Sequence, residues 1–395
     1  MGRREFVVLI AGLMALNALA IDIMLPALGT IAADLKVASA NDRQLVVVAY
    51  ILGFGFPQIV FGPLTDRLGR KPILYLSLAG YALMGVACIV AGTFTQLLVF
   101  RFFQGVFASG VRVVAVSTVR DVYVGRGMAR TMSLIMTIFM AVPILAPSIG
   151  KAILQVAPWE WTFGVLSIAA VGLGLWCMAR LPETLPIEAR APLNVRAVGH
   201  AYLQVFQTRE TAGYMLASGV VFGSLFAFIA SSEQVFTEVF GRGETFTLWF
   251  AGIAAALSVA NFTNSRLVER FGMRRLSHGA ILGFIASAGL LLLLMATVGE
   301  VFWIFFPLFA LCFAFFGLIG SNFNAMAMEP LGKIAGTASA AYGFATTTLS
   351  GIIGGLIGRQ FDGTTLPVLT GYVVLGVTCL AIVFWTERGK LFRSR

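Results

Sequence analysis

Long apolar runs separated by short polar stretches dominate the chain. Most runs hold about 20 residues or more, the length that an α-helix needs to cross the hydrocarbon core of a bilayer. Charged or turn-forming residues bound each run. The pattern therefore predicts an all-α integral membrane protein with twelve transmembrane helices. They are expected at residues 5–33, 43–64, 72–92, 96–119, 128–154, 159–180, 211–236, 245–267, 276–298, 301–328, 335–359 and 366–386.

The longest polar segment, residues 181–209, follows the sixth apolar run and is rich in proline and charge. It predicts a linker between two bundles of six helices, in residues 1–180 and 210–395. The second bundle contains Glu269-Arg-Phe-Gly-Met-Arg-Arg275, which resembles Asp66-Arg-Leu-Gly-Arg-Lys71 in the first bundle at an offset of 203 residues. Such an internal echo predicts two bundles related by pseudo-symmetry.

Composition and charge agree with a membrane protein. Hydrophobic residues make up 58% of the chain and charged residues only 12%, which is not the balance of a soluble domain. Of the 28 lysines and arginines, 21 fall on one side of the twelve-helix arrangement, 5 on the other and 2 inside a helix. Because Lys and Arg accumulate in cytoplasmic loops, both termini are expected in the cytoplasm. The net charge of +10 then reflects topology rather than nucleic-acid binding.

Enzymatic chemistry has no obvious residues to work with. The four cysteines lie singly in different predicted helices. The two histidines, His200 and His278, lie in the central segment and at the start of a helix. No spacing typical of metal ligands or of a nucleophile and its base occurs. We therefore expect no cofactor, no metal site and no enzymatic activity.

One polar stretch, Gly62-Pro-Leu-Thr-Asp-Arg-Leu-Gly-Arg-Lys71, joins the second and third apolar runs. It resembles the signature loop of the major facilitator superfamily, which reads G-x-L-a-D-R-x-G-R-K. The matching residues are Gly62, Asp66, Arg67, Gly69, Arg70 and Lys71. The resemblance implies a transporter in which the loop aspartate helps to close the cytoplasmic side. A solvated loop that only sets the topology is the alternative.

Three further stretches narrow this resemblance: Asp22-Ile-Met-Leu-Pro26, Arg120-Asp121-Val-Tyr123 and Ala335-Gly-Thr-Ala-Ser339. They resemble the bicyclomycin- and chloramphenicol-resistance (Bcr/CflA) branch of the drug:proton antiporters. This resemblance implies a monomer of the bacterial inner membrane that exports small amphipathic compounds in exchange for protons. It also implies that Arg120 and the helix start at 335–338 are partners of Asp66, and it places Asp121 in the same gating region.

Asp22 is the one acidic residue that is expected well inside a predicted membrane helix. A charged group in hydrocarbon is costly, so it is a functional hypothesis by default. Pro26, one turn later, removes a backbone hydrogen bond beside it. A buried, intermittently wetted carboxyl group has the behaviour of a proton carrier. The alternative is a structural Asp22 that is permanently paired with an arginine of a neighbouring helix.

Two arginines, Arg101 and Arg112, lie inside the fourth predicted helix. Their separation of 11 residues is close to three helical turns, so both are expected on one face, where they would meet Asp22. Arg101-x-x-Gln104-Gly105 resembles the helix-4 motif of the superfamily, and this resemblance implies a role in proton coupling for Arg101. Arg112 has no motif of its own and is included by its position.

The fifth predicted helix contains Pro143, Pro147 and Gly150. Prolines bend a helix and glycine permits close packing. The stretch resembles the Pro/Gly-rich motif of antiporters of the superfamily, which implies antiport. A bent packing helix without a bearing on transport is the alternative.

A substrate cavity is expected near the middle of the membrane, between the two bundles. Apolar and aromatic side chains there suit amphipathic drugs, and methionine adapts to varied shapes. The candidate lining residues are Tyr50, Met136, Met140, Phe222, Phe226, Asn261, Asn322 and Tyr342.

The sequence thus predicts proton-driven export, with Asp22 as the proton site and lipid, protons and a small molecule as partners. A proton-coupled carrier of a metabolite such as an amino acid or sugar is one alternative. A membrane receptor or scaffold with the same fold, in which neutralising Asp22 would be harmless, is another. The first apolar run also resembles a cleavable signal peptide, whose removal would leave an odd number of helices.

Overall fold

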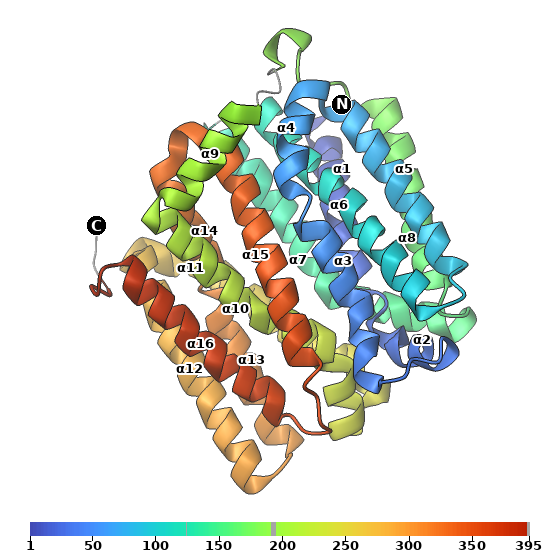
Figure 1. The fold of residues 1–395 in the computed structure, drawn as a ribbon, viewed down its shortest axis with the longest axis vertical. Coiled ribbons are helices and arrows are strands. Elements are labelled where there is room, and N and C mark those ends of the chain that lie inside the picture. The colour runs from blue at the N-terminus through green and yellow to red at the C-terminus, as the bar shows by residue number, and fades with distance from the viewer. Residues whose placement is uncertain (124, 191–194, 393–395) are drawn as a thin grey trace. The chain divides into compact units, whose positions relative to one another are not determined.

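The structure is a computed structural model that describes residues 1–123, 125–190 and 195–392. Every regular element of these residues is helical (Figure 1). Within the described part, 11 helices are long and apolar enough to cross a membrane, and the bent pair Ala40–Gly55 and Gln58–Leu68 brings the number up to 12. The all-α membrane fold expected from the apolar runs is confirmed. The orientation of the termini stays a prediction.

The chain forms two compact units, Met1–His200 and Ala201–Arg395. Their boundary falls inside residues 181–209, where a linker is predicted; residues 191–194 of this stretch lie outside the described part. The stretch also contains a helix that the sequence did not predict, α9 at Val195–Gln207. Val205 of α9 is fully buried against Met215 and other apolar residues of the second unit. This packing stabilises a helix that could not be predicted from a segment rich in prolines and charges.

The first unit contains the helices α1 to α8. Their bounds are α1 Arg3–Asp22, α2 Leu28–Asp34, α3 Leu45–Gly55, α4 Gln58–Leu68, α5 Arg70–Ile89, α6 Phe94–Val122, α7 Gly125–Val156 and α8 Trp161–Arg180. Helix α1 contributes most to the core, because Leu9, Ile10 and Leu13 are fully buried on it. Most residues of this helix are therefore packed against protein, although Val8 is exposed.

The second unit contains most of α9 and the helices α10 to α16. Their bounds are α10 Arg209–Gln234, α11 Phe246–Phe271, α12 Met273–Val298, α13 Phe302–Gly317, α14 Gly320–Met328, α15 Ala335–Gly358 and α16 Leu366–Thr386. Aromatic rings pack much of its core, as where Phe309 lies 5.4 Å from Phe228 and 5.7 Å from Tyr372 between ring centres.

The first membrane segment is interrupted instead of forming one helix over residues 5–33. Helix α1 ends at Asp22, a 3₁₀ turn covers Leu25–Ala27, and α2 begins at Leu28. The cause is Pro26, which has no N–H and whose ring clashes with the preceding turn of a helix. Asp22 therefore lies at a helix end rather than in a helix interior.

The polar stretch at 62–71 is almost entirely helical. Helix α4 extends to Leu68 and α5 begins at Arg70, so Gly69 alone connects them, at a φ of 96°. In the second unit Gly272 connects α11 to α12 in the same way, at a φ of 77°. Positive φ favours glycine, since it has no Cβ. The two glycine connectors therefore show in the backbone the internal repeat that the sequence predicts.

Gly69→Ala is expected to lower the thermal unfolding temperature more than Gly272→Ala. Both changes place a side chain at a positive φ, which costs about 1–3 kcal/mol. At Gly69 the new Cβ would also lie 2.8 Å from a carboxylate oxygen of Glu183 and 2.7 Å from a guanidinium nitrogen of Arg190, whereas nothing lies within 4 Å at Gly272. Thermal unfolding of the detergent-solubilised variants measures the difference.

The control for this comparison is Gly172→Ala, because its position inside α8 also has nothing within 4 Å. This control is expected to leave the unfolding temperature unchanged or slightly raised, since alanine favours a helix interior. Equal losses at Gly69 and Gly272 would show that the contacts around Gly69 contribute nothing.

Candidate functional site

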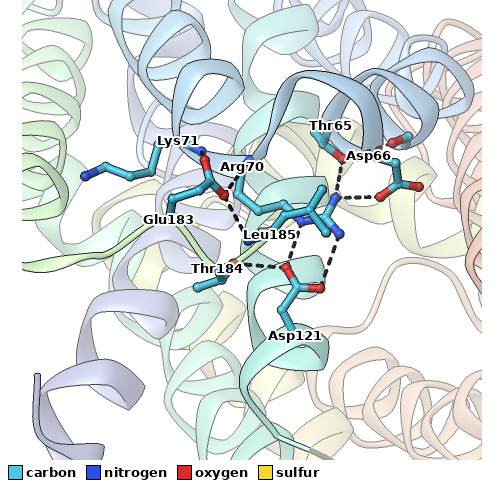
Figure 2. Close-up of polar contacts among 9 residues, drawn as sticks. Thr65, Asp66, Arg70, Lys71, Asp121, Glu183, Thr184 and Leu185 are labelled. Atoms are coloured by element: carbon cyan, nitrogen blue, oxygen red, sulfur yellow. Dashed lines mark hydrogen bonds and ion pairs between the residues drawn. The ribbon is translucent and has the colours of Figure 1, made fainter. Parts of the chain in front are cut away.

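Arg70 is the centre of an ion-pair network where α4 meets α5 (Figure 2). Its Nη1 donates to Oδ1 of Asp66 at 2.6 Å and to Oγ1 of Thr65 at 2.9 Å. Its Nε and Nη2 donate to the two carboxylate oxygens of Asp121 in α6, at 2.8 and 3.2 Å. Only 7% of the Arg70 side chain is exposed, so these charge-assisted bonds lie largely out of water. One guanidinium thus joins α4, α5 and α6.

Glu183, which follows α8, attaches a fourth segment to this network. Its carboxylate accepts the backbone N–H groups of Arg70 at 3.0 Å and Lys71 at 3.1 Å, and so caps the N-terminus of α5 (Figure 2). Burial alone would raise the pKa of Glu183, but the backbone N–H groups and the nearby Arg190 hold this pKa below its ordinary value. Thr184 adds a hydrogen bond to Asp121 at 2.9 Å.

The sequence analysis missed Glu183. Its only signal is its position, three residues after an arginine that ends the sixth apolar run, in Arg180-Leu-Pro-Glu-Thr184. A carboxylate there lies at the same membrane face as the connection between the second and third apolar runs. That makes it a candidate partner for the cations of the connection, but the pattern alone does not select it.

The other members of the signature stretch lie around the network. Gly62 lies within α4, and Arg67 is exposed to solvent. The ammonium nitrogen of Lys71 lies 5.6 Å from the centre of the Tyr75 ring in α5, a distance suited to a cation–π interaction.

The ion pair that Asp66 forms in this structure is with Arg70. It accepts a hydrogen bond from Arg70, and within the described residues it forms no ion pair with Arg120. The other implied partner, the helix start at 335–338, belongs to the second unit, and the side chain of Ala335 lies outside the described part. The pairing of Asp66 with these groups stays a prediction.

Asp22 is buried at the interruption of the first membrane segment. Only 3% of the residue is exposed, and its Oδ1 has no hydrogen-bond partner among the described residues. Neither Arg101 nor Arg112 donates to this carboxyl group; the bonds that they form go to other groups in the described part of the chain. The alternative of a permanent ion pair therefore does not hold in this structure.

Arg101 of α6 is fully buried and is held by neutral groups. Its Nη2 donates to the carbonyl oxygen of Ala20 at 3.0 Å and its Nε to that of Val46 at 3.3 Å, while Nη1 donates to Oε1 of Gln104 at 2.7 Å. Ala20 belongs to the last turn of α1, where carbonyl groups lack partners within the helix. Arg101 thus reaches the helix end that carries Asp22, and it binds the backbone there.

Two aromatic rings complete the surroundings of Arg101. Its guanidinium carbon lies 4.4 Å from the ring centre of Tyr50 and 5.5 Å from that of Phe163, within the range of cation–π interactions. The Tyr50 hydroxyl donates to Oδ1 of Asn17 in α1 at 3.2 Å. Tyr50, a candidate substrate contact from the sequence, is fully buried and supports Arg101 instead.

Arg112 lies further along α6. Its Nη1 donates to Oε1 of Gln58 at 2.9 Å, and its guanidinium lies 5.6 Å from the ring centre of Phe54. These partners belong to α4 and α3, on either side of the bend in the second membrane segment. The structure therefore brings Arg112 to this bend and not to Asp22.

Helix α7 passes directly beside the interruption of the first segment. It continues through Pro143 and Pro147. Gly150 is packed so closely that a Cβ added to it would lie 1.9 Å from the carbonyl oxygen of Ile23, the residue after Asp22. Only glycine permits this approach of two backbones. The antiporter-like helix and the candidate proton site are therefore neighbours.

Six of the candidate substrate contacts are half-buried, Tyr342 of α15 among them. Met136 and Met140 lie on α7 of the first unit, where Met136 packs against the core. Phe222 and Phe226 lie on α10 and Asn261 on α11 of the second unit. Partial exposure leaves part of each side chain open to lipid, water or a ligand.

Two of the candidates, Asn322 and Tyr342, bond within the second unit. Nδ2 of Asn322 in α14 donates to Oδ1 of Asn264 in α11 at 2.8 Å. The hydroxyl oxygens of Tyr342 in α15 and Ser218 in α10 lie 2.6 Å apart. Both pairs join helices of the unit, and contact of these two residues with a substrate stays a prediction.

Metal chemistry finds no support in the described part of the chain. There, no group of three or more His, Cys, Asp and Glu side chains lies close enough to hold a metal ion. The four cysteines are buried and form no disulfide.

A sequence model of the Major Facilitator Superfamily matches residues 10–355. The chain belongs to this superfamily. Its members are membrane transporters, so the protein is a multi-pass membrane transporter and not an enzyme. The family expected from the signature stretch is confirmed.

Relatives within the superfamily include named resistance proteins. The bicyclomycin resistance protein homolog of Haemophilus influenzae is 30% identical over 395 residues, which cover 98% of each chain. The uncharacterized MFS-type transporter YdgK of Bacillus subtilis is 31% identical over 363 residues, 91% of this chain and 90% of its own. The multidrug resistance protein MdtL of Escherichia coli O157:H7 is 30% identical over 261 residues, 65% of each chain. These relatives confirm the resemblance to the drug-resistance branch.

Solved structures share the fold over the whole chain. The xylose transporter XylE of Escherichia coli superposes with a TM-score of 0.76 at 11% identity and covers 100% of this chain and 99% of its own. A D-xylose-proton symporter gives a TM-score of 0.75 at 16% identity with the same coverage. The fold expected for the superfamily is therefore confirmed.

Glu183→Gln is expected to lower the thermal unfolding temperature at neutral pH. The charge that caps α5 is lost while the shape of the side chain stays, and such caps contribute about 1 kcal/mol. The folded-state pKa of Glu183 is lowered, so its stabilisation is present above the unfolded value of about 4.3 and is lost as the pH falls through the folded value. Unfolding temperatures of wild type and variant are expected to differ at about pH 7 and to converge at about pH 3.

Glu188→Gln is the matched control, since Glu188 is exposed in the same segment. It is expected to leave the unfolding temperature within error at each pH. A similar loss in both variants would mean that the capping bonds to α5 do not stabilise the protein.

Proposed function

We propose that this transporter exports small amphipathic compounds in exchange for protons. Two relatives at 30% identity are named as a bicyclomycin resistance protein homolog and a multidrug resistance protein, which favours drugs as substrates. The observation that carries proton exchange is Asp22. It is a buried carboxyl group at an interruption of a membrane helix, and one of its oxygens has no partner among the described residues.

Binding or release of a proton at Asp22 changes the charge of this buried site by one unit. Two contacts hold the backbone on either side of it: Arg101 bonds to Ala20, and Gly150 packs on Ile23. A proton drives exchange only when two conformations bind it with different affinity. In our mechanism these two contacts differ between the conformations, so that Asp22 is exposed to one membrane face at a time.

The Arg70 network is the proposed gating element of the first unit. Arg70, Asp66, Asp121 and Glu183 hold the ends of α4, α5 and α6 and the chain after α8 together. Because the Arg70 side chain and the backbone N–H groups of Arg70 and Lys71 join these segments, they are expected to move as one body. The excess of Lys and Arg supports a cytoplasmic position for this end of the unit. A bacterial inner membrane is the proposed location, and a monomer is the proposed working form.

Substrate contacts are proposed for the half-buried residues Met136 and Met140 in the first unit, and Phe222, Phe226 and Asn261 in the second. Flexible thioethers and aromatic rings adapt to apolar compounds of varied shape. An amide supplies a hydrogen bond that fixes orientation. Tyr50 is assigned instead to the support of Arg101, because it is fully buried.

Asp22→Asn is expected to abolish drug-dependent proton movement. The amide keeps the size of the side chain and removes the proton-binding group. Purified protein in liposomes with an internal pH dye, challenged with chloramphenicol-type compounds, measures the movement. The wild type should change the internal pH when drug is added, and the variant should match protein-free liposomes.

Asp34→Asn is the control, because Asp34 is exposed in α2 and accepts a hydrogen bond from Trp159 that an amide oxygen also accepts. This variant is expected to couple drug and protons as the wild type does. Full coupling in Asp22→Asn would exclude Asp22 as the proton site. Drug movement by the wild type without protons would exclude exchange.

A further inference from the structure

A second buried cluster of charged groups lies in the second unit, at the start of α12. Nε of Arg274 donates to Oε1 of Glu387, just after α16, at 2.8 Å. The same guanidinium lies 3.7 Å from a carboxylate oxygen of Glu329, just after α14. Only 8% of each of the Arg274 and Glu387 side chains is exposed. The cluster joins the ends of three membrane segments.

A tyrosine and a histidine extend this cluster inward. The Tyr214 hydroxyl of α10 donates to Oε1 of Glu387 at 2.6 Å. It also lies 3.3 Å from Nε2 of His278 in α12, which is fully buried. Burial alone would raise the pKa of Glu387. The hydrogen bonds from Tyr214 and Arg274 have the larger effect and hold this pKa below its ordinary value. Glu387 therefore stays charged over the range in which histidine titrates.

The chain after α16 folds back onto the other ring nitrogen of His278. The backbone N–H of Phe392 donates to Nδ1 of His278 at 3.2 Å, and the two rings pack edge to face at 5.7 Å. Nε of Arg275 donates to the carbonyl oxygen of Phe392 at 3.2 Å. We call residues 389–392 the tail segment. It is bound to the first turns of α12 through both backbone polar groups of Phe392.

These contacts fix the protonation of His278. A backbone N–H can only donate, so Nδ1 must accept and carries no proton. The proton of the neutral ring is then on Nε2, where it is donated to the Tyr214 oxygen, whose own proton goes to Glu387. A second proton, at Nδ1, would replace the acceptor with a donor that faces the Phe392 N–H. Binding of the tail segment and protonation of His278 are therefore mutually exclusive.

We propose that His278 is a second proton-binding site, distinct from Asp22, and that its protonation releases the tail segment from α12. Because the C-terminus is expected in the cytoplasm, the site responds to cytoplasmic rather than external pH. The tail segment is bound when the ring is neutral and is released as the pH falls. The inference does not depend on the drug specificity of the transporter.

The charged groups around His278 come from each neighbouring element. Helix α10 supplies Tyr214, α12 supplies Arg274, and the chain after α16 supplies Glu387. Glu329 lies behind Arg274. Two further cations are Arg388, just before the tail segment, and Lys390, within it. Burial of the ring and the charge of Arg274 favour the neutral ring, and Glu387 opposes them. The hydrogen bond from Phe392 adds to the preference for the neutral form.

Hydrogen exchange of the Phe392 amide in the full-length protein in nanodiscs tests the proposal. Protection is expressed relative to the intrinsic exchange rate at the same pH, which removes the chemical effect of pH. In the wild type we expect protection to fall about twofold or more between about pH 8 and about pH 4, because burial of the ring and the nearby Arg274 move its protonation well below the ordinary histidine range. His278→Asn, whose amide oxygen replaces Nδ1 as acceptor and does not titrate, should show equal protection at both values.

His200→Asn is the matched control, because the chain has only two histidines and His200 is exposed. It should keep the wild-type response to pH. Constant protection in the wild type, or an unchanged response in His278→Asn, would overturn the proposal.

A second measurement covers the case in which His278→Asn does not fold. Nitrogen NMR of the ¹⁵N-histidine-labelled wild type reports which ring nitrogen carries the proton. At about pH 8 the buried histidine should carry it on Nε2. A proton on Nδ1 would be incompatible with the bond from Phe392 and would equally overturn the proposal.

Discussion

The interruption of the first membrane helix is the constraint on which the buried polar part of the first unit depends. Inside a bilayer, each backbone N–H and C=O group must find a partner within the protein. Pro26 stops the helix and so leaves carbonyl groups without helical donors. Arg101 binds one of them at Ala20, and the close approach of Gly150 covers another at Ile23. Pro26 in the first membrane segment thus accounts for the need for Arg101 in α6 and for Gly150 in α7.

The surroundings of Arg101 follow from the same constraint. A buried guanidinium is costly unless hydrogen bonds and nearby electron-rich groups replace its water. Carbonyl oxygens, an amide and the ring of Tyr50 do so without any carboxylate. Because these partners are neutral, the charge of this region depends on whether Asp22 holds a proton. In a medium of low dielectric constant such a change acts over more than contact distance. Asp22 and Arg101 can therefore be coupled without an ion pair.

The sequence predicts the helices well because the bilayer fixes their length, and it predicts the family because the signature residues are contiguous. Asp22 and Gly150 could be singled out for similar local reasons, an acid and a glycine in apolar surroundings. One partner of Arg70, Glu183, could not be predicted because it lies 113 residues away in the sequence. Helical periodicity placed Arg101 and Arg112 on one face, but it does not say which neighbouring helix that face meets.

Each unit has a buried arginine that binds carboxylates at helix ends, but the position of this arginine differs by one residue between the two repeats. The repeat aligns Arg70 with Met273 and Lys71 with Arg274. Arg274 is nevertheless the residue that pairs with a carboxylate at the end of a later helix, Glu387, as Arg70 pairs with Asp121. Both guanidiniums lie in the first turn of a helix that follows a glycine of positive φ, where one step along the helix is easily absorbed. The same offset of 203 residues places Tyr75 opposite His278. Tyrosine stays neutral over the whole acidic range, whereas a histidine can take up a proton there. Of these two aligned positions only the one in the second unit can bind a proton, so the proposed sensitivity to pH arises from a difference between the repeats rather than from their symmetry.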